Sequence, residues 1–186
     1  MSTASPVSAD WELTYLTMGP DGARDALRKA LSMGGDAAFQ VRDDALHGSD
    51  AFATSLVLAA AIQRIGFDLV LTGVASTDAG MGVVPALLAE RLAVPQLTFA
   101  IVSVTDRTGE ARYPSFKGIM AAKKKPVDTL SLADLGIDPG LVGLAAARST
   151  VLSASRRPAR TAGEQVKDDG DGGKLLADFL AANRFI

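Results

Sequence analysis

Apolar and polar residues follow two different periods along the first two thirds of the chain. Short β-prone runs at residues 11–17, 37–41, 68–73 and 99–104 predict strands. Between them, apolar residues recur at helical spacing from Asp21 to Gly34, from Ser49 or Asp50 to Ile65 and from Val83 to Leu92. Strands that alternate with helices of this length predict an α/β fold with a doubly wound, mostly parallel sheet and right-handed crossovers, as in Rossmann-like proteins.

Three of these segments carry more specific expectations. Asp21 can cap the start of the first helix. The second helix is apolar almost all round, which favours deep burial; its apolar residues include Phe52, Leu56, Val57, Leu58 and Ile62. The strand at 68–73 is a continuous apolar run, typical of a strand buried on both faces of a parallel sheet.

The pattern loosens in the C-terminal third of the chain. Leu130–Leu135 predicts a short strand or turn and Ser149–Ser153 an extended piece, while residues 155–173 are polar and helical spacing returns in Lys174–Ile186. We therefore expect a disordered N-terminus at 1–10 and an α/β domain at 11–154 that carries a loop at 110–127. A C-terminal arm and helix at 155–186 would dock on a partner subunit.

Composition narrows the classes of function. The net charge is −2, without the basic field that drives nucleic-acid binding. The chain has no cysteine, which excludes disulfides, thiolate nucleophiles and cysteine-ligated metals, and one histidine, His47. It has no run of 18 apolar residues and no secretory signal at its start, so we expect a cytoplasmic protein without membrane insertion.

One glycine-rich loop follows the third predicted strand and leads into a predicted helix. The segment from Gly73 to Gly82 holds three glycines, the hydroxyls of Ser76 and Thr77, and the carboxylate of Asp78. Glycines let backbone N–H groups approach a phosphate, and the start of the helix adds positive partial charge. The loop therefore fits a nucleotide phosphate site at the carboxyl edge of the sheet, although an ordinary strand-to-helix turn has the same composition.

A second distinctive stretch runs from Glu110 to Val127. It combines a turn at Tyr113-Pro114-Ser115, the large apolar residues Phe116 and Met120, and the lysines 123–125. This is poor material for a core strand or helix and indicates a surface loop built for a partner. A solvated basic turn is the alternative.

Other polar residues do not combine into a site. His47 has no partner at a catalytic spacing, so we interpret it as an ordinary loop histidine. Asp43 with Asp44, and the acidic group around Asp168, lack the ligand spacing of a calcium loop and are interpreted as solvated acids.

The stretch 110–127 resembles the signature of the electron-transfer flavoprotein beta subunit. Nine residues match its pattern: Arg112, Tyr113, Phe116, Ile119, Met120, Ala122, Lys123, Lys124 and Lys125. The resemblance extends to Leu16-Thr-Met-Gly-Pro20, to the loop with Asp78 and to Thr161-Ala-Gly-Glu164. It implies a sheet of the adenine-nucleotide-binding type.

The resemblance also implies a function. Beta subunits of this family pair with an alpha subunit, share FAD with it and bind AMP as a structural ligand. They carry electrons from acyl-CoA dehydrogenases of fatty acid beta-oxidation, and from related dehydrogenases, to a membrane quinone oxidoreductase and so to the respiratory chain. This chain would then be an electron carrier subunit and not an enzyme.

The implied site residues fall into two groups. The nucleotide would contact Met18, Gly73, Ser76, Thr77, Asp78, Gly80, Gly82, Val83 and Val84. Partner recognition would fall to Arg112, Tyr113, Phe116, Met120, Lys123, Lys124 and Lys125, with Phe116 inserted into the dehydrogenase.

The chain departs from the family pattern in two places, and two other functions are open. It lacks the opening strand and helix before Trp11 and a segment of antiparallel strand between Thr98 and Ala100. One alternative is a stand-alone adenine-nucleotide-binding regulatory module resembling universal stress proteins. The other is an inactive, truncated relative that only pairs with another chain.

Overall fold

The computed structural model describes residues 11–76, 80–95, 101–104, 112–156 and 168–185, with the backbone alone for 101–104. The chain divides into two compact units, Met1–Thr150 and Val151–Ile186. The predicted boundary between the domain and the arm, at residue 155, lies close to this division.

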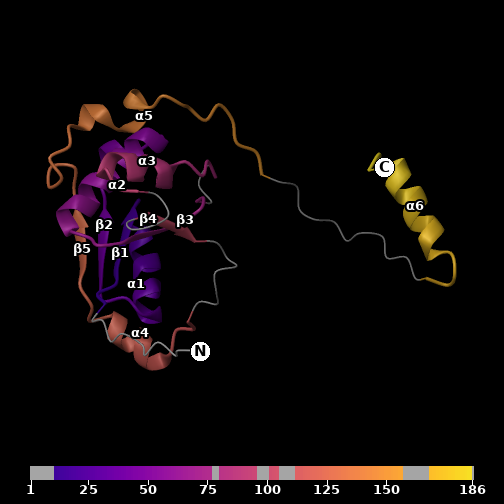
Figure 1. The fold of residues 1–186 in the computed structure, drawn as a ribbon, viewed down its shortest axis with the longest axis horizontal. Helices are drawn as coiled ribbons and strands as arrows, with labels where there is room; N and C mark the ends of the chain where they lie inside the picture. Colours follow the sequence, from indigo (N-terminus) through magenta and orange to yellow (C-terminus); the bar gives the residue numbers. More distant parts are fainter. Residues whose placement is uncertain (1–10, 77–79, 96–100, 105–111, 157–167, 186) are drawn as a thin grey trace, which may run out of the picture. The chain divides into compact units, whose positions relative to one another are not determined.

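Within the described ranges, five strands form two sheets, and the strands within each sheet are parallel (Figure 1). The larger sheet has the order β1 (Thr14–Met18), β2 (Ala37–Val41) and β5 (Val127–Leu130), and the smaller one pairs β3 (Val70–Gly73) with β4 (Ile101–Val104). In register, Met18 lies opposite Val41 and Gly73 opposite Val104. The loops that follow β1 and β2 therefore leave from the same edge of the larger sheet.

The first unit contains five described helices: α1 (Ala23–Met33), α2 (Ala51–Ile65), α3 (Val84–Leu92), α4 (Phe116–Ala122) and α5 (Gly143–Ala146). Short 3-10 turns lie at Asp44–Leu46 and Pro139–Leu141. The second unit contains α6 (Gly172–Ala182). None of the helices in the described ranges is long and apolar enough to span a membrane.

Helices cover both faces of the larger sheet. Successive side chains of a strand point to opposite faces, so different residues of β2 pack against different helices. Ala38 of β2 packs with Leu27 and Leu31 of α1 and with Ala122 of α4. Val41 of the same strand packs on the other face, in a cluster that includes Val57 of α2. A third cluster joins α2 to α3. This arrangement confirms the doubly wound α/β fold.

The predicted strands and the first three helices are all present, with ends shifted by a few residues. The expectation of a strand buried on both faces is wrong for β3. Leu71 is 56% exposed and Leu69 just before the strand is 44% exposed. The physical reason is that β3 and β4 form a separate sheet, so one face of this ribbon has no helix over it among the described residues.

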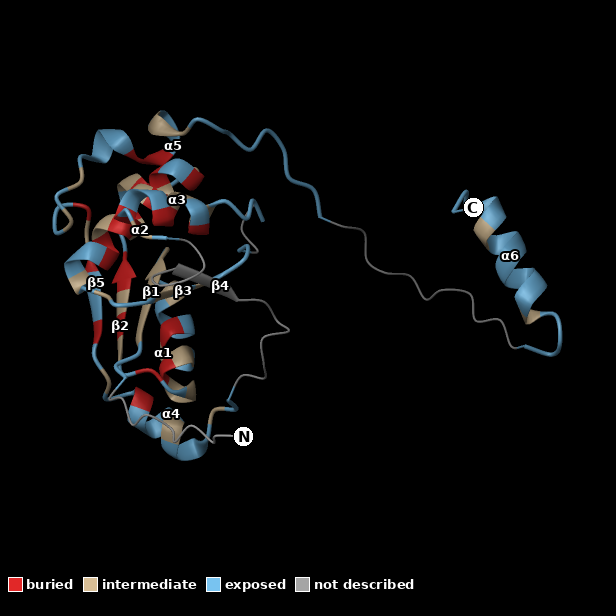
Figure 2. Cartoon of the chain, in the orientation of Figure 1, coloured by how far each residue is buried: buried red, intermediate tan, exposed pale blue. Residues whose placement is uncertain are grey.

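The expected deep burial of α2 holds for most of the helix, in which Phe52, Gln63 and Arg64 are the exposed residues. Its buried positions are mostly small residues, including Ala53, Ser55 and Ala61, whereas Phe52 is 43% exposed. Figure 2 shows buried residues along α2, which contributes to one core cluster with the larger sheet and to another with α3. Small side chains at most of these positions allow close packing on both sides.

Two local predictions need correction, while residues 149–153 belong to no helix or strand. The stretch at 110–127, expected to be a surface loop, includes α4 and the first residue of β5. Asp21 does not cap α1, whose N-cap is Gly22 without a side-chain hydrogen bond, because the Asp21 carboxylate pairs with Arg42 instead.

Candidate functional site

The glycine-rich loop after β3 leads directly into the first turn of α3. Gly80 and Gly82 have φ values of +61° and +67°, in the left-handed region that favours glycine. Gly73, Ser76 and Val83 are exposed, Val84 is half-buried, and the N-cap residue Val83 offers no side-chain hydrogen bond to the helix start. Val83 therefore supplies no side-chain cap to this first turn.

Two residues of the predicted nucleotide site, Thr77 and Asp78, lie outside the described residues. Met18 is half-buried at the end of β1 and packs against the cluster that contains Val41 and Leu130. Its proposed contact with adenine remains a prediction. The N–H of the next residue, Gly19, donates to the carbonyl oxygen of Val41 at 3.1 Å, which fixes the start of the loop after β1.

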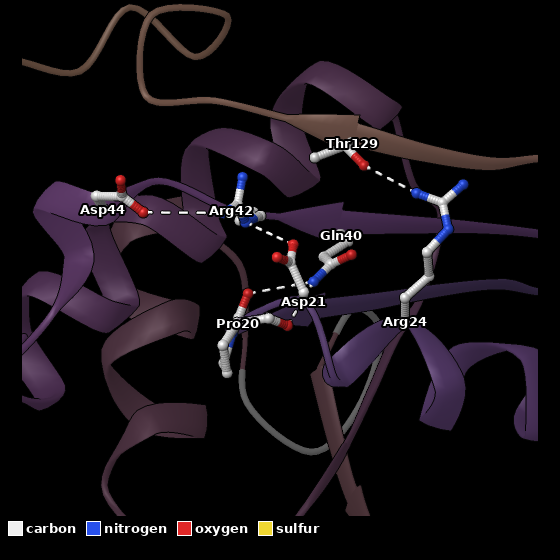
Figure 3. Close-up of polar contacts among 8 residues, drawn as sticks. Pro20, Asp21, Arg24, Gln40, Arg42, Asp44 and Thr129 are labelled. Atoms are coloured by element: carbon white, nitrogen blue, oxygen red, sulfur yellow. Dashed lines mark hydrogen bonds and ion pairs between the residues drawn. The ribbon is translucent and has the colours of Figure 1, made fainter.

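A polar network that the sequence analysis did not identify lies beside this loop (Figure 3). Gln40 is buried in β2, and its Nε2 donates to the carbonyl oxygens of Gly19 and Pro20 at 3.2 and 2.7 Å. Arg42 Nε lies 2.6 Å from the Asp21 carboxylate. The sequence signal was a glutamine at a position where the alternation of β2 calls for burial. These contacts hold the loop after β1 against β2.

Arg24 of α1 ties the same region to β5. Its guanidinium donates to Thr129 Oγ1 at 3.3 Å and to the Val127 carbonyl oxygen at 3.0 Å. Together with Gln40 and Arg42, it ties the loop after β1 and the first turn of α1 to β2 and β5.

The second candidate surface is α4 with the turn that precedes it. Tyr113 is 96% exposed, Phe116 is 81% exposed, and Met120 is 48% exposed. Ser115 is the N-cap of the helix, and its Oγ accepts the N–H of Gly118 at 3.0 Å. The large apolar side chains predicted to face a partner are therefore on the surface, and they stand on a capped helix. Arg112 is exposed as well.

Contacts with α1 fix the position of α4. Arg28 of α1 donates through Nη1 to the carbonyl oxygens of Ala122 and Lys125, at 2.7 and 2.6 Å. Ala122 is buried against Leu31 and its neighbours. Because the helix is bound at its last turn, its exposed side chains are presented in a defined place.

The three lysines after α4 have different environments. Lys123 and Lys124 are exposed. Lys125 is half-buried, and its Nζ donates to the carbonyl oxygens of Leu31, Gly34 and Gly35 at the end of α1. A cation at this place satisfies helix carbonyls that have no partner within the helix. We therefore assign Lys125 a structural role, and recognition remains a prediction for Lys123 and Lys124.

The remaining polar candidates have local roles or none. Asp43 caps the turn Asp44–Leu46 by accepting the N–H of Ala45 at 3.0 Å, and Asp168 accepts the N–H groups of Gly170 and Gly172. His47 is exposed at the end of that turn. Within the described ranges, no group of three or more acidic or histidine side chains could hold a metal ion.

Comparisons with known proteins point to one family. The family model for the electron transfer flavoprotein domain matches residues 2–114. Beta subunits of electron transfer flavoproteins from Mycobacterium tuberculosis and Mycobacterium leprae are 44% and 45% identical to this chain, over 94% of it and 77% of each relative. A subunit of the caffeyl-CoA reductase-Etf complex from Acetobacterium woodii is 30% identical, over 83% of this chain and 71% of that protein.

The alignments are longer than this chain. The alignment with the Mycobacterium tuberculosis protein runs over 204 residues, whereas this chain has 186. The relative therefore contains residues inside the aligned region that have no counterpart here. This agrees with the observation that an internal segment of the family pattern is missing from the sequence.

Proposed function

The chain belongs to the family of electron transfer flavoprotein beta subunits, and we propose that it acts as the beta subunit of such a carrier. In this role it pairs with an alpha subunit and accepts electrons from acyl-CoA and related dehydrogenases. It passes them through a membrane quinone oxidoreductase to the respiratory chain, and it makes and breaks no substrate bonds itself.

The surface of α4 is the observation that carries this proposal. Phe116 and Met120 are large, apolar and exposed on a helix that Arg28 and Ser115 hold in place. A folded protein exposes such side chains on a fixed element where a partner covers them, and a few of them supply most of the binding energy. A docked dehydrogenase would be the partner that covers Phe116 and Met120.

Pairing with an alpha subunit is supported by the uncovered side of the smaller sheet. Leu69 and Leu71 are exposed on and beside β3, and Val74, Met81 and Val83 are exposed in the loop that follows it. An apolar surface of this kind at the end of a strand is typical of a subunit interface. The second unit adds Leu175, Leu176 and Phe179, which α6 leaves exposed and which would dock on the same partner.

The loop between β3 and α3 fits AMP as a structural ligand. Left-handed glycines at 80 and 82 give backbone N–H groups access to a phosphate, and the first turn of α3, which the side chain of Val83 does not cap, adds donors of the same kind. Gly73, Ser76, Val83 and Val84 would complete the contacts, with Thr77 and Asp78 between them.

FAD would be shared with the alpha subunit and would supply the redox chemistry. The described residues of this chain offer backbone donors and apolar surface at the end of β3, which suits one wall of a shared site. The role of this chain toward the flavin is to orient it and to shield it from water.

Co-expression with the alpha subunit of the same organism tests the proposal. We expect a heterodimer that keeps a yellow flavin through gel filtration, whereas the beta chain alone stays colourless. A nucleotide module of the universal stress type would bind adenine nucleotide without a partner. An inactive relative that only pairs with another chain would form a colourless heterodimer. The experiment includes this outcome because residues of the relatives' aligned region are missing from this chain.

A further inference from the structure

A groove of about 500 Å³ runs between α1 and α4. Its apolar lining comes from Pro114, Ile119 and Ala122, and Lys29 and Lys123 stand at its rim. Volumes of this size are common for sites that take up a ligand or the side chains of a partner. The groove does not overlap the proposed nucleotide loop, which lies between β3 and α3.

The polar side chains along this groove are already engaged with the backbone. Arg28 donates to the carbonyl oxygens of Ala122 and Lys125, and Ser32 Oγ donates to the carbonyl oxygen of Lys29 at 2.6 Å. Sites for small polar ligands need several polar groups that converge on the ligand. These contacts favour an apolar side chain as the occupant over a small polar molecule.

The rim of the groove carries unbalanced positive charge. Lys29 and Lys123 line the groove and are exposed, and neither forms an ion pair with another described residue. The exposed Lys117 and Lys124 lie nearby along the chain without lining it. An apolar centre with a charged rim is the usual anatomy of a protein interface. The complementary segment therefore carries carboxylates.

The groove is continuous with the exposed surface of α4. Phe116, Ile119 and Met120 stand at positions i, i+3 and i+4 of this helix, so they share one side of it. Ile119 belongs both to this row and to the lining of the groove. A partner that covers Phe116 meets the groove in the same footprint.

We propose that this groove receives an apolar side chain flanked by carboxylates, supplied by the dehydrogenase that docks on α4. The inference rests on the proposed function for the identity of the partner. Two contacts then run in opposite directions: Phe116 enters the partner, and a residue of the partner enters the groove between α1 and α4. Lys29 and Lys123 pair with the flanking carboxylates.

A synthetic peptide with one leucine flanked on both sides by glutamates serves as the probe. Titrated into the ¹⁵N-labelled full chain, it should shift the backbone amides of Ser32, Ile119, Ala122 and Lys123 and saturate them. A matched peptide with glutamines in place of the glutamates should bind more weakly by about tenfold, as expected when two charge pairs are lost. No shifts at these residues, or equal binding of both peptides, would overturn the proposal.

Lys123 and Lys124 form a matched pair for the decisive variants, since only Lys123 lines the groove. Lys123→Glu should weaken the glutamate peptide by about tenfold and Lys124→Glu by about twofold, because the second change alters only the long-range field. Equal losses of affinity in the two variants would show that the lysines act only through long-range electrostatic attraction, and this would contradict a contact of Lys123 in the groove. Ile119→Ala should weaken both peptides.

The peptide titration is independent of flavin binding and of the alpha subunit. A chain that forms a yellow heterodimer but does not bind the peptide would refute the groove and leave the proposed function intact. A chain that binds the peptide but forms no flavoprotein would refute the proposed function alone.

Discussion

Gly118 of α4 lies so close to Ser32 of α1 that a Cβ atom at position 118 would stand 2.5 Å from the Ser32 carbonyl oxygen. Only a glycine permits this approach, because the obstacle is backbone and cannot rotate away. The contact places α4 against the end of α1 and, with the Arg28 hydrogen bonds, sets where Phe116 stands.

Replacing Gly118 by alanine should therefore push the two helices apart. We expect a net loss of stability, since overpacking costs about 1–3 kcal/mol and the better helix propensity of alanine returns about 1 kcal/mol. Urea unfolding of the full chain measures this. Gly22→Ala is the control, because a Cβ at Gly22 meets nothing within 4 Å, and it should lower the unfolding midpoint less than Gly118→Ala, through the poorer N-cap alone.

Lys125 should matter for stability and Lys124 should not. Lys125→Met removes the ammonium that binds the carbonyl oxygens at the end of α1, and we expect a loss of about 1–2 kcal/mol. Lys124→Met makes the same chemical change at an exposed position and should stay within about 0.5 kcal/mol. Equal melting temperatures for the two variants would show that the Lys125 contacts add no stability.

Asp50 couples the stability of α2 to pH. The N–H of Ala53 donates to its carboxylate at 3.0 Å and is the main reason that the pKa of Asp50 lies below the ordinary value of 3.8. A lowered pKa stabilises the fold above pH 3.8, and this contribution disappears as the pH falls through the folded-state value.

Two substitutions at Asp50 separate the cap from the charge. Asp50→Ala should cost about 1 kcal/mol at neutral pH, whereas Asp50→Asn keeps an acceptor for the helix start and should cost less. Thermal unfolding between pH 7 and pH 3 should show a shallower acid loss in both variants than in the wild type. An unchanged acid slope in Asp50→Asn would assign the pH dependence to other carboxylates.

AMP affinity should depend on Gly82. A valine at this position cannot adopt the φ of +67° without strain, so the loop that presents the backbone donors would change shape. We expect calorimetric titration of the heterodimer to show AMP binding weakened by more than tenfold. Gly136→Val is the matched control, because Gly136 is exposed with φ of +66° in a different turn. Equal AMP affinity in both variants would exclude this loop as the phosphate site.

The order of strands and helices through residue 104 could be predicted because local patterns determine it. The periods of α1, α2 and α3 and the short apolar runs of β1 and β2 stand out in the sequence, and packing preserves them. Burial was predicted less well. Leu71 and Phe52 are exposed because the sheet divides into two and α2 packs through alanines, and neither fact is visible in a single sequence.

Contacts distant in the sequence explain why α4 was missed. The helix is short and contains Gly118, so its own propensity is poor. Arg28, 94 residues before Ala122, binds its last turn. The structural role of Lys125 was hidden for the same reason, since its partners at 31–35 are far away along the chain. The exposure of Phe116 and Met120 was predicted correctly, because a polar neighbourhood leaves large apolar residues no core to enter.

In the proposed function, α4 seats this subunit on a dehydrogenase through Phe116, and the rate of flavin reduction measures this docking. The heterodimer with its alpha subunit is mixed with a sub-saturating acyl-CoA dehydrogenase and substrate, and wild type is compared with Phe116→Ala. A loss of about 2 kcal/mol in docking predicts a rate about thirtyfold lower, with an unchanged melting temperature because Phe116 is 81% exposed. A variant that is reduced as fast as wild type would contradict the claim.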